Sequence, residues 1–118
     1  MTDEMEPIVR TWSATASTGG AGDYSRYFAG TLLPQLRELP GFAGAYLLRR
    51  DLDHEGTVEL TAHTFWDSPE AIRAFAGDDL TVAIVEPEAE AMLLDFDRIV
   101  THRRVVADAR VGRGAQGG

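Results

Sequence analysis

The sequence predicts an α+β fold in which helices cover one face of a four-stranded antiparallel sheet. Segments with period-two alternation of apolar residues and segments with helical spacing follow one another as strand, helix, strand, strand, helix, strand. That order is typical of the split βαβ, or ferredoxin-like, arrangement. A second observation is that the third strand ends on Trp66 and passes directly into a helix, which fixes one junction of sheet and helix.

The third strand and the helix after it are the most clearly marked unit of the chain. Strand alternation gives it two faces, one with Val58, Leu60, Ala62, Thr64 and Trp66 and one with Glu59, Thr61, His63 and Phe65. Both faces carry apolar bulk, so we expect an interior strand. Asp67 or Ser68 can cap the helix that follows, and Gly77 is suited to end it. The apolar stripe of this helix consists of Ala71, Ile72 and Phe75.

The segment before this unit is predicted to form a strand, a helix and a second strand. The first strand covers residues 7–16 and is followed by a flexible turn at 17–22. Asp23 can cap the helix, and Pro34 removes a backbone donor from it and should kink it. The apolar positions of this helix are Tyr24, Tyr27, Phe28, Leu32, Leu36 and Leu39. The second strand covers residues 42–50, and a polar hairpin turn joins it to the third strand.

The segment after this unit is less regular. Residues 78–97 are predicted to form one or two short helices around Pro87, and residues 98–107 are predicted to form the fourth strand. The two ends of the chain, residues 1–6 and 108–118, have no apolar pattern. We therefore expect them to be a disordered leader and a disordered tail.

The composition is that of one globular domain of 118 residues with a formal charge of −8. This acidic balance, without a basic stripe, argues against a nucleic-acid partner. The apolar runs are too short to span a bilayer and the first residues do not resemble a signal peptide, so we expect a cytoplasmic protein without a membrane partner. There is no cysteine, and the acidic residues 86–97 are not interleaved with histidine, so no metal site is expected.

Both faces of the predicted sheet carry apolar and aromatic residues, although the helices of the chain can cover only one of them. The simplest cover for the second face is another copy of the same protein. The sequence therefore predicts a homodimer.

Four stretches of the chain are distinctive in their order and spacing: the first strand with Trp12, LPGFAGAYLLRR at 39–50, TFWDSPEAIRAFAG at 64–77 and VTHRRVV at 100–106. Together they resemble the antibiotic biosynthesis monooxygenase domain family. The resemblance covers residues 7–107, the predicted folded domain. It implies a dimeric α+β barrel, in which two ferredoxin-like protomers pair their sheets.

The resemblance implies more than one activity, because the family includes cofactor-independent oxygenases of aromatic polyketides, haem-degrading enzymes and proteins without known activity. Trp66 matches the tryptophan that the polyketide oxygenases have at the end of the third strand. Ala62 and Ile72 stand where those oxygenases have an asparagine and a tyrosine. A polyketide-type oxygenation would therefore use different polar groups in this chain.

The haem-degrading branch is a poorer match. Thr11 and Val85 stand near the positions of its asparagine and its histidine, and Phe75 stands where that branch has a helix tryptophan. Haem degradation is therefore not expected, and no cofactor is expected.

His102 is the candidate catalytic base, because histidine titrates near neutral pH and can accept a phenolic or enolic proton. The alternative is a structural histidine bonded to a backbone or carboxylate group. His63 faces away from Trp66 by strand parity, so we expect it on the dimer side of the sheet, with a lesser claim to the site.

The tryptophans Trp12 and Trp66 are candidate flat walls for an aromatic substrate, with ordinary core packing as the alternative. Tyr24 and Tyr27 lie three residues apart on one helix face, and either hydroxyl can bond a ligand carbonyl. Phe75, on the helix after Trp66, is a further candidate contact.

The two arginines of the second strand, Arg49 and Arg50, point to opposite faces, so one of them must face inward or lie at an edge. A buried arginine needs a partner. Glu59 across the hairpin or an anionic ligand could supply it.

These features lead to the hypothesis of a cofactor-independent, monooxygenase-like enzyme that oxidises a small electron-rich aromatic, such as an anthrone or a hydroquinone, with O2. A base removes a phenolic proton, the anion passes an electron to O2, and the oxygen adduct collapses to quinone and water. The expected catalytic residues are His102 and Trp66, and the expected substrate contacts are Trp12, Tyr24, Tyr27, Phe75, Arg49 and His63. Two alternatives stay open: a non-catalytic small-molecule-binding or stress-associated barrel, and an oxygen-independent cyclase or isomerase.

Overall fold

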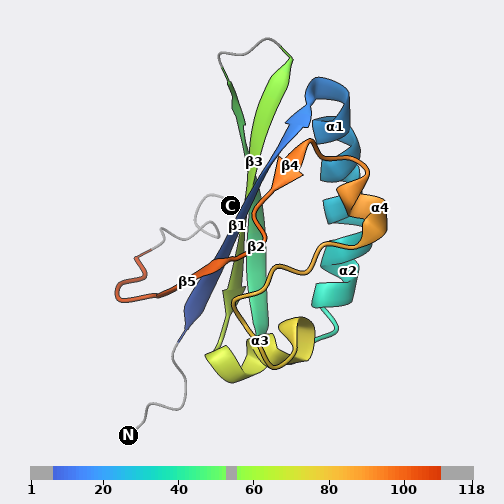
Figure 1. Ribbon diagram of the computed structural model, residues 1–118. Coiled ribbons are helices and arrows are strands. Elements are labelled where there is room, and N and C mark those ends of the chain that lie inside the picture. The colour runs from blue at the N-terminus through green and yellow to red at the C-terminus, as the bar shows by residue number, and fades with distance from the viewer. Residues whose placement is uncertain (1–6, 53–55, 110–118) are drawn as a thin grey trace, which may run out of the picture.

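The computed structural model describes residues 7–52 and 56–109, with a helical layer against one face of an antiparallel sheet (Figure 1). The strands are β1 (Ile8–Ser17), β2 (Phe42–Asp51), β3 (Thr57–Trp66), β4 (Asp95–Phe96) and β5 (Thr101–Arg104). The helices are α1 (Thr18–Tyr27), the π-helix η1 (Phe28–Leu32), α2 (Leu33–Leu36), α3 (Pro69–Ala76) and α4 (Pro87–Glu90). The predicted ferredoxin-like α+β class is confirmed. The predicted leader, most of the predicted tail and part of the hairpin turn lie outside the described residues.

The sheet has the order β2-β3-β1, and both β4 and β5 pair with the far side of β1. β1 and β3 pair along their whole length, from Ile8 opposite Trp66 to Ser17 opposite Thr57. Because opposite residues of an antiparallel pair point to the same side, this register decides which side chains face the helices. The buried side chains of these strands are Ile8, Arg10, Trp12, Ala14, Ala16, Val58, Leu60, Ala62, Thr64 and Trp66.

The fourth strand predicted over residues 98–107 is present but shorter, as β5 (Thr101–Arg104). A further two-residue strand, β4, precedes it, and the two pair with different parts of β1. Between them the chain bonds to the loop before α4: the Ala83 amide donates to the Arg98 carbonyl (2.9 Å), and the Val100 amide donates to the Thr81 carbonyl (2.8 Å). The alternation of apolar residues does not reveal this change of partner, because the segment is extended both where it pairs with β1 and where it bonds to the loop before α4.

The first helix begins earlier than predicted. Its cap is Ser17 and not Asp23, because the Ser17 hydroxyl accepts a hydrogen bond from the Gly20 amide (3.0 Å). The predicted flexible turn at 17–22 is therefore helical. A Cβ at Gly20 would collide with the carbonyl of Met92, so glycine lets α1 pack closely on the chain after α4. This packing and the cap outweigh the low helix propensity of glycine.

Pro34 lies inside the helical layer, just after a π-helical turn. In that turn the Leu33 amide donates to the carbonyl of Phe28, five residues earlier. The wider turn directly precedes the position where proline lacks an amide donor, and the helix continues through Leu36.

Of the one or two short helices predicted around Pro87 in residues 78–97, the structure has one. This helix, α4, has four residues and begins at Pro87. The chain before it runs as a loop over the covered face of the sheet, and its backbone bonds to residues 98 and 100. These long-range bonds replace the helical ones that the local pattern predicted.

The junction after β3 agrees with the prediction. The Ser68 hydroxyl accepts from the Ala71 amide (3.3 Å), and α3 ends at Gly77, whose φ of 83° favours glycine. Trp66 is 1 % exposed, with its ring stacked on Phe75 (centroids 6.1 Å apart). The end of the sheet and α3 therefore share one small core.

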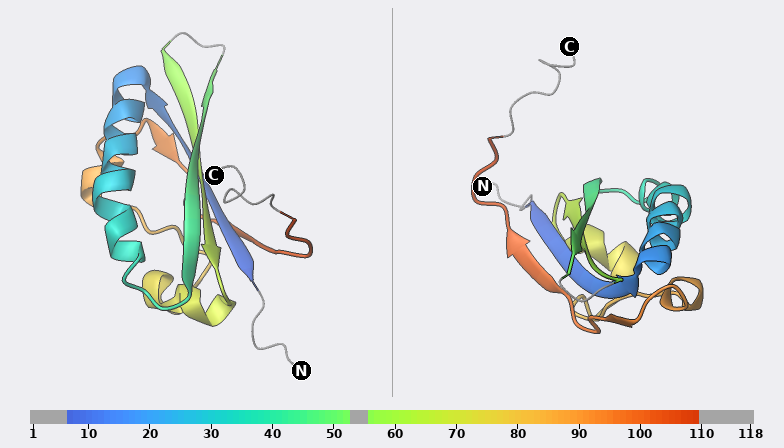
Figure 2. Two further views of the ribbon diagram at one scale, coloured as in Figure 1. Left: turned by 180° about the vertical axis from the view of Figure 1, so that it is seen from behind. Right: turned by 90° about the horizontal axis from the view of Figure 1, so that it is seen from above.

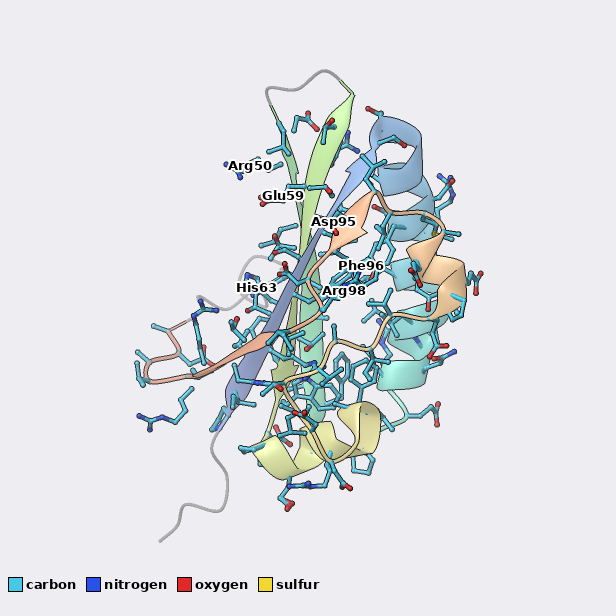
Figure 3. The ribbon with its side chains drawn as sticks, viewed as in Figure 1. Arg50, Glu59, His63, Asp95, Phe96 and Arg98 are labelled. Carbon is cyan, nitrogen blue, oxygen red and sulfur yellow. The ribbon has the colours of Figure 1, made fainter. Side chains whose placement is uncertain are left out.

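The second face of the sheet carries no helix in the part of the chain that the structure describes (Figure 2). Its side chains are a mixture of apolar and polar residues. Tyr46 is 53 % exposed and Leu48 is 46 % exposed, and the ring of Tyr46 meets that of Phe65 edge-on at 5.5 Å. Arg50 donates to Glu59 across the hairpin at 3.0 Å (Figure 3). We refer to this surface as the open face.

Candidate functional site

A cavity lies between the covered face of the sheet and the helical layer. It offers about 80 Å³ to water-sized molecules, and about 700 Å³ when its open mouth is included. Its aromatic walls are Trp12, Tyr24, Tyr27, Phe28 and Phe75. Its polar lining residues are Arg10, Gln35, Thr64 and Glu86. Mostly apolar walls with a few polar groups are typical of a site for a small, flat ligand.

Arg10 supplies the buried charge of this cavity. It is 4 % exposed and extends from the middle of the covered face. Its Nη1 donates to the Leu80 carbonyl (2.5 Å) and its Nη2 donates to the Val82 carbonyl (2.9 Å). The guanidinium carbon also lies 5.6 Å from the centre of the Phe75 ring. The loop before α4 and helix α3 therefore hold the guanidinium in place.

The charge of Arg10 has no counter-charge in the described part of the chain, where no carboxylate forms an ion pair with it. Burial lowers the pKa of Arg10, yet an arginine stays charged at any physiological pH. Of its five N–H donors, three are used by the two carbonyls and by His102. The Nε hydrogen and one Nη2 hydrogen have no partner among the described residues.

His102 lies behind Arg10, not on the cavity wall. Its Nε2 is 3.1 Å from Arg10 Nη1, because β5 pairs residue 102 with residue 10 of β1. Arginine only donates, so Nε2 must accept, and the neutral ring carries its proton on Nδ1. Burial, and secondly the charge of Arg10, lower the pKa of His102 below 6.5.

This contact predicts a pH-dependent stability. The unfolded chain protonates His102 at a higher pH than the folded chain does, so unfolding takes up a proton and becomes easier as the pH falls. We expect the free energy of unfolding to fall as the pH drops from 6.5 to the lowered pKa of His102. Urea unfolding between pH 5 and 8 measures this pH dependence. His102→Gln, whose amide oxygen can accept from Arg10, should make the free energy of unfolding less dependent on pH; an unchanged pH dependence would assign it to other groups.

The two tyrosines form an aromatic wall with Trp12. The Tyr24 ring lies 5.7 Å from the Trp12 ring and 5.7 Å from the Tyr27 ring. Burial and the neighbouring Tyr27 raise the pKa of Tyr24, and burial with the charges of Glu86 and Glu88 raises that of Tyr27. Neither hydroxyl bonds to a residue within 7–52 or 56–109. Both therefore stay protonated at neutral pH and are free to bond a ligand.

Trp12 lines the cavity, and a hydrogen bond to the backbone fixes the orientation of its ring. Its Nε1 donates to the Asp97 carbonyl at 2.9 Å, in the segment between β4 and β5. The indole hydrogen bond is thus satisfied within the protein, and the ring is left for apolar contact with a ligand.

Trp66 lies one layer behind the cavity. Its Nε1 donates to the Thr64 hydroxyl at 2.9 Å, and its ring stacks on Phe75; both of these partners line the cavity. Trp66 itself does not line it. The alternative of core packing is therefore the better description of its contacts, and any effect on a ligand passes through Thr64 and Phe75.

Two of the expected substrate contacts lie away from this cavity. Arg49 is at the exposed end of β2, where its Nε donates to Asp51 at 3.1 Å. His63 lies on the open face, as strand parity predicted, with its Nδ1 3.0 Å from the Thr11 hydroxyl oxygen (Figure 3). The structure thus brings together Trp12, Tyr24, Tyr27 and Phe75 of the expected contacts, and leaves these two outside.

Arg10 is a cavity residue that was not among the predicted site residues. The signal was present, because strand alternation places it between Ile8 and Trp12 on the apolar face of the first strand. An arginine on such a face is rarely buried without a partner or a ligand. The partners it does have, two loop carbonyls, could not be identified from the pattern.

No group of three or more histidine, aspartate or glutamate side chains that could hold a metal ion occurs within residues 7–52 and 56–109. In the same residues no helix is long and apolar enough to cross a membrane.

The fold is that of antibiotic biosynthesis monooxygenase-like proteins. A Bacillus cereus protein assigned to that class matches with a TM-score of 0.61 and 16 % identity, covering 90 % of this chain and 99 % of that one. A haem-degrading protein from Mycobacterium tuberculosis matches with a TM-score of 0.60 and 21 % identity, covering 92 % of this chain and 100 % of that one. SnoaB, a cofactor-independent oxygenase from Streptomyces nogalater, matches with a TM-score of 0.53 and 16 % identity, covering 90 % of this chain and 97 % of that one. No family model and no curated protein sequence matches the chain.

Proposed function

We propose that the protein binds a small, electron-rich aromatic in the cavity and oxidises it with O2 without a cofactor. The observation that supports this most is an aromatic-walled cavity with one buried guanidinium, Arg10, in its lining. Such a site suits a flat ring that becomes negatively charged. The shared fold with a cofactor-independent oxygenase supports the same reaction class.

For an anthrone, the reaction begins with loss of a proton to give the enolate. The enolate gives one electron to O2, and the resulting radical pair joins into a carbon–oxygen bond at the former methylene carbon. Loss of the second hydrogen of that carbon, with cleavage of the O–O bond, gives the quinone carbonyl. One oxygen atom of O2 stays in the product, and the other leaves with the two hydrogens as water.

The residues of the cavity have three roles in this scheme. Trp12 and Tyr24 hold the ring between β1 and α1, with water excluded. Arg10 places a positive charge beside the oxygen that becomes negative and so lowers the pKa of the bound phenol or enol. His102 is the assigned proton acceptor. It can take the proton only when a ligand oxygen displaces its Nε2 from Arg10, because that nitrogen is engaged in the free protein.

Binding without turnover is the second candidate function. It is favoured by the position of His102 behind Arg10 and by Ala62, which leaves that part of the wall without a polar group. A cyclisation or isomerisation without oxygen is a third outcome of the same experiments.

The test is a reaction of purified protein with an anthrone under ¹⁸O2, followed by mass spectrometry of the product. The proposal predicts one ¹⁸O atom per quinone, formed faster than in buffer and more slowly with His102→Gln. A product without ¹⁸O would assign the turnover to an oxygen-independent reaction. Saturable binding with no product above the buffer rate would assign the protein to the binding class.

We also infer that two copies pair through their open faces. The partly exposed Tyr46 and Leu48 beside Phe65 form an apolar area that a monomer would leave in water. The polar side chains of the open face can bond to one another across strands, as Thr11 does with His63. A paired sheet of this kind gives the dimeric α+β barrel that the sequence predicted.

A charge on the open face should dissociate this dimer. We expect Leu48→Lys to sediment as a monomer, because pairing would bury its ammonium group. Ala29→Lys introduces the same charge on the exposed side of η1 and should remain dimeric. A wild-type protein that is monomeric at all concentrations would contradict the inference.

A further inference from the structure

We infer that the natural ligand carries an oxyanion, which Arg10 binds with its two unused donors, while the aromatic body lies against Trp12 and Tyr24. The inference rests on the proposed binding of an aromatic in this cavity and narrows its ligand to an aromatic acid: a carboxylate or a phenol that is ionised when bound. It concerns specificity and does not depend on turnover.

The buried charge of Arg10 favours a bound anion. Arg10 is almost completely buried, and a buried cation without a counter-ion is unfavourable unless something supplies the missing charge. The groups that hold it are the carbonyls of Leu80 and Val82 and the neutral ring of His102. They orient the guanidinium but leave its charge uncompensated.

The free donors of Arg10 suit an oxyanion. A guanidinium binds an oxyanion through neighbouring N–H groups, and the two nitrogens of Arg10 that keep a free hydrogen, Nε and Nη2, are neighbours in the guanidinium. The three used donors fix the plane of the fork before a ligand arrives. Because Arg10 lines the same cavity as Trp12 and Tyr24, one ligand can meet the charge and the aromatic walls together.

The two arginines of β2 are paired with carboxylates and do not line the cavity. Arg49 pairs with Asp51, and Arg50 pairs with Glu59 on the open face. The remaining charged group of the cavity lining is Glu86, which is exposed and negative. The cavity therefore presents its positive charge inside, where an anion is desolvated and held most strongly.

The experiment compares two probes of equal shape in the wild-type protein, 2-naphthoate and 2-naphthamide, by tryptophan fluorescence at pH 7 without O2. We expect the carboxylate to bind about 10- to 100-fold more tightly than the amide, the usual range for hydrogen bonds to a charged group. A nitronaphthol that is ionised at pH 7 is the third probe and separates a phenolate preference from a carboxylate preference.

Variants assign the effect to Arg10. Arg10→Gln should bind both probes with the weaker affinity of the amide, and Arg10→Lys should keep part of the preference because it keeps the charge but not the fork. Arg49→Gln is the matched control and should behave as wild type. Should Arg10→Gln fail to fold, the wild-type comparison of the probes still decides.

The outcomes separate this inference from the proposed function. Equal affinities for the two naphthyl probes in the wild-type protein would overturn the inference that the ligand carries an oxyanion, but not the proposed binding of an aromatic. No binding of any aromatic probe would overturn the inference and the proposed function together.

Discussion

Trp66→Ala is expected to lower the free energy of unfolding by about 3–5 kcal/mol, the range observed when a buried aromatic side chain is truncated. Trp66 is among the largest fully buried side chains of the protein. Its ring meets Phe42 edge-on at 5.2 Å and stacks on Phe75, so its loss opens a cavity between the end of the sheet and α3. Urea unfolding followed by circular dichroism measures the change.

Trp66→Phe is the control for this prediction. It keeps an aromatic ring against Phe75 but loses the hydrogen bond to Thr64, so we expect a smaller loss of stability than for alanine. Because Trp66 lies behind the cavity wall, the phenylalanine variant should keep most of its ligand affinity. A stable Trp66→Ala protein with abolished turnover would instead make Trp66 a direct participant in the chemistry.

Ala62→Leu is expected to block ligand binding without unfolding the protein. Ala62 lines the cavity from β3, so a larger side chain there projects into empty space. It occupies the room of about three methylene groups of a ligand, which at about 0.8 kcal/mol each amounts to a roughly 50-fold increase in Kd. Fluorescence titration with an aromatic probe measures the affinity, and urea unfolding measures the stability.

Ala62→Ser is the matched control, since its side chain is close to alanine in size and should leave the affinity nearly unchanged. A loss of binding together with a loss of stability would indicate a damaged core rather than a filled cavity. Wild-type affinity in Ala62→Leu would show that the aromatic binds somewhere else, and would remove the basis of the proposed site.

The parts of the fold that the sequence predicted well depend on neighbours in the chain. Strand alternation up to Trp66, the cap at Ser68 and the stop at Gly77 are all local, and the structure has each of them. The predicted secondary structure is in error where contacts with segments distant in the sequence determine the local conformation. The Met92 carbonyl packs closely against Gly20, and the partners of residues 98 and 100 lie in the loop before α4.

The candidate site likewise has some features that local sequence patterns predict and others that depend on long-range contacts. Helical spacing and strand parity suffice to bring the tyrosines of α1 to the same side as Trp12, and in the structure the Tyr24 ring lies 5.7 Å from that of Trp12. The contact of Arg10 with His102 depends on the register of β1 against β5, which no local pattern fixes. For that reason the histidine was recognised as a candidate base, while the arginine in front of it was not.

Oxygen uptake with an anthrone at pH 7 in metal-free buffer decides whether the protein oxidises a bound aromatic with O2. We expect one O2 consumed per anthrone at a rate that rises with protein concentration, and a rate close to that of buffer with Ala62→Leu. Uptake at the buffer rate with wild-type protein, under conditions in which the anthrone is shown to bind, would show that the protein binds the aromatic without oxidising it.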